Sequence, residues 1–182
     1  MAHNPLTNLP NRALLGDRIG QALSHANRSQ TRAAILYCDL DGFKGINDSF
    51  GHHAGDLVLK TVGERFVSCI RGNDTVARVG GDEFVFVLPE LESLEHAGIV
   101  AEKILDAISR SIRVEKREFV LSGSIGIAIY PLDGDNPERL IRSADAAMYQ
   151  AKERGKNNYK FFTESILPQR AEQADVPQRY RR

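Results

Sequence analysis

The chain has 182 residues, of which 42% are hydrophobic and 26% are charged, and these values are typical of one globular domain. Its 24 basic and 24 acidic residues cancel, so no net positive charge favours binding of a long nucleic acid. No apolar run approaches the roughly 18 residues of a membrane span, and no charged and then apolar leader opens the chain. Together with two cysteines that lack metal-like spacing, these features predict a cytoplasmic domain without membrane contact.

Hydrophobic periodicity predicts helices and strands that alternate along the chain. The helices are expected at 11–29, 54–70, 91–109 and 137–155, with a short helical piece before the second of them. The strands are expected at 33–40, 75–79, 84–88, 113–114, 118–121, 123–130 and 159–162. In the third helix Ile99, Ile104, Leu105 and Ile108 are expected to face the core. The pattern predicts an α/β (α+β) domain at 1–163 and a linker or disordered tail at 164–182.

The sequence RVGGDEF at 78–84 predicts a hairpin with acids at its tip. Gly80 and Gly81 can adopt the positive φ values of a tight turn, and β-branched and aromatic residues flank them. Asp82 and Glu83 are therefore expected to be presented, not buried. Taken alone, such a turn can also serve only to join two strands, with the acids as solubilising residues.

A second acidic site follows the apolar run at 33–38, which is typical of a strand covered on both faces. Asp39 and Asp41 come directly after this run and, being two residues apart, are expected to point to the same face. Hard oxygen ligands of this kind suit Mg²⁺, which usually takes one or two protein carboxylates plus substrate phosphates. The alternative is a pair of solvated aspartates at the end of a strand.

Five separated blocks carry a resemblance to a known family. They are NPLTNLPNR at 4–12, DLDGFKGIND at 39–48 with GHHAGD at 51–56, RGND at 71–74, GGDEF at 80–84, and the stretch from Ala144-Asp145 to Gly155-Lys156-Asn157. In this order they resemble the GGDEF domain, the catalytic module of diguanylate cyclases, over 4–162. The resemblance implies a central mixed, mainly antiparallel sheet flanked by helices, similar to the palm of nucleotidyl cyclases and polymerases.

The resemblance also implies an activity, which is condensation of two GTP into cyclic di-GMP and pyrophosphate by metal-assisted phosphoryl transfer. It implies two Mg²⁺ (or Mn²⁺) ions per half-site, a homodimer that brings two half-sites together, and feedback inhibition by the product. The residues implied to bind metal are Asp39, Leu40 through its carbonyl, Asp82 and Glu83. Asp82, Glu83 and Lys44 are implied to be catalytic, with Asp82 accepting the proton of the attacking hydroxyl and Lys44 stabilising phosphoryl charge.

Further residues are implied to bind GTP or the product. Phe43 through its backbone N–H, Lys152 and Lys156 are implied to hold phosphates, while Gly80 and Gly81 let the chain approach the substrate. Asn47 and Asp56 are implied to read guanine, since a carboxylate can accept from N–H groups that adenine lacks. Arg71 and Asp74 resemble the product-inhibition site. For Arg71 and Asp74 the alternative is an exposed ion pair at a helix end, which contributes little to stability.

Three departures from the family pattern are present: Lys156 stands where Arg is commoner, Asn4 where Asp is common, and Asn8 where Gly is frequent. None removes a metal carboxylate, and Asn tolerates cap and left-handed conformations. Two other functions stay open. The first is a non-catalytic module of a larger signalling protein that binds GTP or cyclic di-GMP. The second is a polymerase-like palm that extends a nucleic acid, which the neutral charge disfavours.

Overall fold

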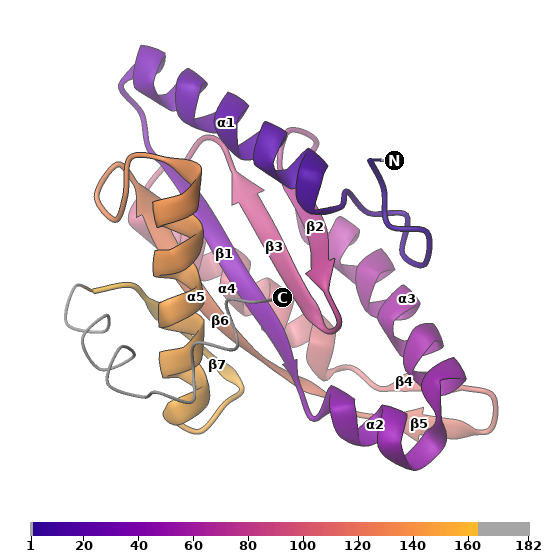
Figure 1. Ribbon diagram of the computed structural model, residues 1–182. Coiled ribbons are helices and arrows are strands. Elements are labelled where there is room, and N and C mark those ends of the chain that lie inside the picture. Colours follow the sequence, from indigo (N-terminus) through magenta and orange to yellow (C-terminus); the bar gives the residue numbers. More distant parts are fainter. Residues whose placement is uncertain (1, 164–182) are drawn as a thin grey trace.

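The structure, a computed structural model, describes residues 2–163 and contains five helices and seven strands (Figure 1). The helices are α1 (Arg12–Ser29), α2 (Phe43–Phe50), α3 (His52–Ser68), α4 (Leu94–Ser109) and α5 (Pro137–Glu153). The strands are β1 (Ala33–Asp41), β2 (Thr75–Gly80), β3 (Glu83–Leu88), β4 (Ile112–Val114), β5 (Arg117–Phe119), β6 (Ser122–Tyr130) and β7 (Asn158–Phe161). The predicted tail at 164–182 lies outside the described residues.

Five strands form one sheet in the order β2-β3-β1-β6-β7, and β4 pairs with β5 in a separate hairpin. Neighbours in the large sheet are antiparallel except β6 and β7, which are parallel. The predicted mixed, mainly antiparallel sheet flanked by helices is therefore confirmed. Near the end of the central strand β1, Asp39 lies opposite Glu83 of β3 and opposite Ser124 of β6.

Helices cover both faces of the sheet, with α1 and α5 on one face and α3 and α4 on the other (Figure 1). Side chains of β1 alternate between the two cores: Ile35 and Tyr37 pack with α1 and α5, whereas Leu36 and Cys38 pack with α3 and α4. Every residue of β1 is buried. The apolar run at 33–38 is thus the predicted strand covered on both faces.

Side-chain caps fix the starts of three helices, because Asn11, Ser93 and Asn136 each accept a hydrogen bond from the backbone N–H three residues later. The cap at Ser93 starts α4 three residues after the predicted position. The prediction that Ile99 faces the core is wrong, since its side chain is 53% exposed while Ile104 is fully buried. Five residues turn a helix by about 140° beyond a full turn, so these two side chains lie on different faces.

The closest packing of a helix on the sheet occurs where α5 crosses β6 at Gly126. A Cβ atom added to Gly126 would overlap the carbonyl oxygen of Ala144 and the backbone nitrogen of Met148. The small residues Ala144 and Ala147 on the buried face of α5 allow the same approach from the helix side. Gly126 therefore sets the distance between α5 and the sheet, and with it the position of residues at the end of α5.

We expect Gly126→Ala to lower the free energy of unfolding by about 1–3 kcal/mol or more, because backbone atoms on α5 cannot move aside as a flexible side chain could. Gly16→Ala is the matched control: Gly16 is exposed in α1, and outside its own helix the described residues place no atom within 4 Å of an added Cβ. That control should gain about 0.5–1 kcal/mol. Urea unfolding of both variants measures the difference, and equal stabilities would contradict the close contact at Gly126.

Candidate active site

Three polar side chains, those of Tyr37, Asp39 and Asp41, follow one another on the α5 face of β1. The Tyr37 hydroxyl donates to Oε1 of Glu83 over 2.8 Å, and Nζ of Lys152 lies 2.8 Å from Oδ2 of Asp39. Asp39 and Asp41 are 2% and 8% exposed. The expectation that both point to one face is confirmed, and the alternative of two solvated aspartates is wrong.

The hairpin between β2 and β3 brings Asp82 against the end of β1. The N–H of Leu40 donates to the carbonyl oxygen of Asp82 over 3.2 Å, and the Asp82 side chain hydrogen bonds with Asp39. Burial, and next the negative charge of Asp39, raise the pKa of Asp82 to about 7, although Lys152 opposes this. Two carboxylates so close need a proton or a cation between them.

This donor set fits a divalent magnesium-like ion. A cation placed between Asp39 and Asp82 would replace the proton that the raised pKa of Asp82 otherwise retains. Within residues 2–163, no group of three or more His, Cys, Asp or Glu side chains is arranged to hold a metal ion. A site with two carboxylates suits Mg²⁺, which completes its shell with water and substrate phosphates, better than it suits zinc.

Glu83 departs from the expectation that both acids of the hairpin are presented. Glu83 is only 1% exposed, and its carboxylate accepts a hydrogen bond from the Tyr37 hydroxyl. The physical reason is that Glu83 is already the first residue of β3, paired with Asp39, so that only Gly81 and Asp82 form the turn. Glu83 supports the hairpin from within the sheet.

Two arginines hold the hairpin from outside. Nε of Arg78 donates to the carbonyl oxygen of Gly81 over 3.0 Å, and Nη2 of Arg12 donates to the carbonyl oxygen of Val79 over 3.0 Å. Arg78 also donates to Oδ1 of Asn4 over 3.3 Å. Gly81 has a φ of 32°, as a tight turn requires. The hairpin tip is thereby tied both to β2 and to the N-terminal turn.

Helices α2 and α3 place the predicted guanine-reading residues next to each other. Oδ1 of Asn47 is buried and has no hydrogen-bond partner among the described residues, and a Cβ on Gly55 would overlap it. The neighbouring Asp56 is exposed, and its charge acts on Arg78 together with that of Asp82. A buried acceptor without a donor suits a ligand that brings N–H groups.

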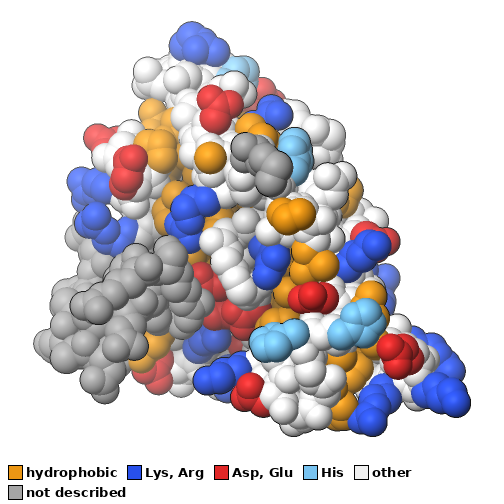
Figure 2. Space-filling model, turned by 45° about the vertical axis from the view of Figure 1, so that its right-hand side comes forward, with side chains coloured by type: hydrophobic (Ala, Val, Ile, Leu, Met, Phe, Trp, Pro, Cys, Tyr) orange, Lys and Arg blue, Asp and Glu red, His pale blue; other side chains and the backbone are white. Residues whose placement is uncertain are grey.

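The predicted phosphate-binding residues lie at the ends of α2 and α5. Gly42, with a φ of 79°, precedes α2, where Phe43 is buried and Lys44 is exposed. At the other side Lys152 is held by Asp39, while Lys156 is exposed in the turn that leads to β7. In Figure 2 acidic side chains gather near the middle of one face, and basic side chains lie around them.

The predicted product-inhibition residues form a turn at the end of α3. Oδ2 of Asp74 accepts from the backbone N–H of Arg71 over 2.9 Å. The Arg71 guanidinium instead pairs with Glu92, at 3.1 Å between exposed side chains. An exposed ion pair is thus present, but Asp74 is not its partner.

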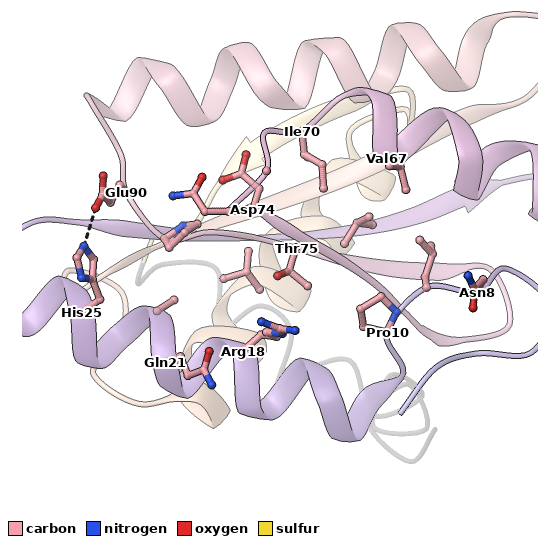
Figure 3. A pocket seen from close by; sticks show the side chains of 17 residues that line it. Asn8, Pro10, Arg18, Gln21, His25, Val67, Ile70, Asp74, Thr75 and Glu90 are labelled. Carbon is pink, nitrogen blue, oxygen red and sulfur yellow. Dashed lines mark hydrogen bonds and ion pairs between the residues drawn. The ribbon is translucent and has the colours of Figure 1, made fainter. Parts of the chain in front are cut away.

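Asp74 also lines a cavity of about 640 Å³ between α1 and the edge strand β2 (Figure 3). Arg18 and His25 of α1 line the same cavity, and Nε2 of His25 lies 2.6 Å from Oε1 of Glu90. None of the carboxylates at the end of β1 belongs to its lining. A smaller cavity of about 210 Å³ adjoins Arg71 and Glu92.

The family model described as diguanylate cyclase, GGDEF domain, matches residues 1–158. The chain belongs to the GGDEF domain family. It is 48% identical over 174 residues to MucR of Pseudomonas aeruginosa, a bifunctional diguanylate cyclase/cyclic di-GMP phosphodiesterase, and the match covers 96% of this chain and 25% of MucR. This GGDEF domain thus spans about a quarter of the length of that relative.

Solved structures show the same fold. The GGDEF domain of TpbB from Pseudomonas aeruginosa has a TM-score of 0.89 and 39% identity, with 91% of this chain and 97% of that chain covered. DgcB from Caulobacter crescentus, solved with its coiled coil and in complex with cyclic di-GMP, has a TM-score of 0.80 and 28% identity over 88% and 85% of the two chains. None of the described helices of this domain is both long and apolar enough to cross a membrane.

Sequence reasoning missed several residues that build the site. Tyr37, within the apolar run at 33–38, binds Glu83, and Arg78, next to the hairpin glycines, binds the carbonyl of Gly81. Ser122 and Ser124 donate to Asp41 from the start of β6. A signal for the serines exists, because polar residues at alternate positions of a strand lie on one face.

The pKa of Asp82 predicts how stability depends on pH when divalent cations are removed with a chelator. The pKa is about 7 in the folded protein against 3.8 as its ordinary value, so the folded state holds a proton that the unfolded state has lost. The contribution of Asp82 to the free energy of unfolding is fully present below about pH 4 and is lost as pH rises towards 7. Over this range the free energy of unfolding falls by at most about 1.4 kcal/mol per pH unit.

We therefore expect Asp82→Asn to flatten this dependence and to be more stable than the parent at pH 8. Urea unfolding at pH 5, 6.5 and 8 measures it. Asp133, whose pKa is also raised by burial, is present in both proteins and cancels in the comparison. Parallel curves for parent and variant would show that Asp82 does not titrate in this range.

Proposed function

We propose that this GGDEF domain is a diguanylate cyclase that condenses two GTP into cyclic di-GMP and releases pyrophosphate. The observation that carries the proposal is the meeting of Asp39 and Asp82 at the buried end of β1, with Lys152 beside them. The buried acceptor Oδ1 of Asn47 on α2, and the exposed residues Lys44 and Lys156, are also expected to serve this site. The similarity to TpbB and MucR, both named diguanylate cyclases, supports the same reaction.

In each half-reaction the 3′-hydroxyl oxygen of one GTP forms a bond to the α-phosphorus of the other, and the bond to pyrophosphate breaks. Asp39, Asp82 and the carbonyl of Leu40 would hold Mg²⁺ or Mn²⁺, which neutralises phosphate charge and lowers the pKa of the hydroxyl when bound. The Asp82 carboxylate lies at this point beside Asp39 and would accept the hydroxyl proton. In the second half-reaction the two nucleotides exchange roles, which closes the ring and releases the second pyrophosphate.

The other residues bind and orient the substrate in this proposal. Lys44 and Lys156 contact the β- and γ-phosphates, together with the backbone N–H of Phe43. Oδ1 of Asn47 and the carboxylate of Asp56 accept N–H groups of guanine, which favours GTP over ATP. One chain supplies one half-site, so two chains must meet, and the rate should rise faster than linearly with protein concentration.

Mutation of the two carboxylates tests the proposal. Asp39 is buried, Asp82 is half-buried and the two are hydrogen bonded, so Asn is a gentler replacement than Ala. With Mg²⁺ and GTP, Asp39→Asn and Asp82→Asn should each retain less than about a tenth of the cyclic di-GMP formation, a loss above about 1.4 kcal/mol of transition-state stabilisation. Asp17→Asn, at an exposed position of α1, is the matched control and should keep the parent rate.

Chromatography of the products identifies cyclic di-GMP directly, and ATP replaces GTP in a parallel reaction. Comparable turnover of ATP would reject the guanine-reading roles of Asn47 and Asp56. A parent protein that forms no cyclic di-GMP at high micromolar concentration would reject the enzyme and leave a regulatory module that binds nucleotide.

We also propose that Arg71 and Asp74 bind the product. The related structure of DgcB, which was solved in complex with cyclic di-GMP, supports binding of this nucleotide by the family. Arg71→Ala should keep the initial rate, accumulate more cyclic di-GMP before the reaction stalls, and bind added product more weakly by calorimetry. A loss of initial rate with unchanged product binding would place Arg71 in the catalytic site or in the fold.

The ion pair of Arg71 with Glu92 supplies a second variant for the same prediction. The product must displace Glu92 to reach the guanidinium, so Glu92→Gln should bind cyclic di-GMP a few-fold more tightly, and no more, because the pair is exposed. Weaker binding by this variant would mean that Glu92 contacts the product itself.

A further inference from the structure

Asp41 is a buried carboxylate at the end of β1 that the proposed reaction does not use. Asp41 is 8% exposed, and it accepts hydrogen bonds from two serine hydroxyls and one backbone N–H, all of them neutral donors. Oδ2 accepts from the Ser122 hydroxyl over 2.7 Å and from the backbone N–H of Asn157 over 3.1 Å. Oδ1 accepts from the Ser124 hydroxyl over 2.9 Å. A carboxylate buried in this way is held firmly by its donors.

The bond to Asn157 reaches a backbone turn that needs support. Gly155, Lys156 and Asn157 have φ values of 108°, 64° and 48°, so two residues with a Cβ follow each other in the left-handed region. The N–H of Lys156 donates back to the carbonyl of Ala151 in α5 over 3.1 Å. The Asp41 carboxylate accepts from the Asn157 N–H and so binds this turn to the end of β1.

The turn and α5 are therefore joined to β1 at two successive levels. Asp39 pairs with Lys152 in the last turn of α5, and Asp41, two residues further along β1, binds Asn157. Lys156 lies between these two points in the sequence and is exposed. The chain on either side of Lys156 is thus held by β1, at Lys152 and at Asn157, while the Lys156 side chain is exposed to solvent.

We propose that Asp41 is a positioning residue that anchors the turn at 155–157 so that Lys156 meets the β- and γ-phosphates of GTP. Asp41 acts through the backbone of Asn157 and touches neither substrate nor metal. The inference rests on the proposed binding of GTP at this site. It separates the two acids of the Asp39-Leu40-Asp41 sequence, because Asp39 belongs to the metal site and Asp41 to the phosphate-binding turn.

Three variants of Asp41 distinguish its role as a hydrogen-bond acceptor for the turn from a role of its negative charge. Asp41→Ala and Asp41→Ser cannot reach the Asn157 N–H, whereas Asp41→Asn can keep an oxygen there and donate its amide to the Ser124 hydroxyl. The probe is the α,β-methylene analogue of GTP, which cannot be turned over, with Mg²⁺ present. We expect the Ala and Ser variants to bind it about tenfold more weakly and Asn to stay within about threefold of the parent.

GMP, which lacks the β- and γ-phosphates, should bind all variants as it binds the parent. Ser122→Ala is the matched control, because it removes one donor to Asp41 and leaves the bond to Asn157. Hydrogen exchange at the Asn157 amide, followed by NMR, should quicken in Asp41→Ala and Asp41→Ser and stay slow in Asp41→Asn. Either of the first two variants suffices where the other does not fold.

A double-mutant cycle with Lys156→Ala decides whether Asp41 acts through the turn. In the Lys156→Ala background, Asp41→Ser should weaken binding of the analogue by no more than about twofold further. An undiminished tenfold effect there, or an Asn variant as weak as Ala, would overturn the proposal and indicate that the charge of Asp41 itself acts on ligand or metal. A parent that binds the analogue but forms no cyclic di-GMP would reject only the proposed reaction, and a parent that does not bind it would overturn both.

Discussion

The site depends on one constraint, which is that carboxylates at the buried end of β1 must each be compensated. Glu83 accepts from the Tyr37 hydroxyl, and Asp41 accepts from three neutral donors. Asp39 and Asp82 share a single lysine, Lys152, and their mutual repulsion contributes to the raised pKa of Asp82. Among these carboxylates, Asp39 and Asp82 are the two whose side chains contact each other directly. That contact is where a divalent cation stabilises the site most.

The register of the sheet puts these groups within reach of one another. Asp39 pairs with both Glu83 and Ser124, so a shift of one residue in either strand pair would send an acid to the opposite face, among the apolar side chains of α3 and α4. The close contact at Gly126 then brings α5 near enough for Lys152 to reach Asp39. The fold therefore determines the electrostatics of the site, because each polar side chain at the end of β1 has its partner on a neighbouring strand or on α5.

Much of this arrangement could be predicted from the sequence, since periodicity located the helices and strands and the alternation rule placed Asp39 and Asp41 on one face. What failed depended on tertiary structure. The second strand of the hairpin was expected to begin at Phe84, one residue after the observed start of β3, so Glu83 was expected to be exposed. Ile99 was expected on the core face of its helix and is exposed. The partners of Asp41 come from residues more than 80 positions away, and no local pattern pairs such residues.

Strand β2 connects the two regions that the proposed function uses. It begins directly after Asp74 and ends at Gly80, where Arg78 holds the carbonyl of Gly81. Six residues of extended chain span about 20 Å, so the turn of Arg71 and Asp74 and the tip of the hairpin lie at opposite ends of β2. Product bound at Arg71, as proposed above, would act on the hairpin through a change in the position of β2. The contacts of Arg78 with both the hairpin and Asn4 make the end of β2 the place where such a change would reach Asp82.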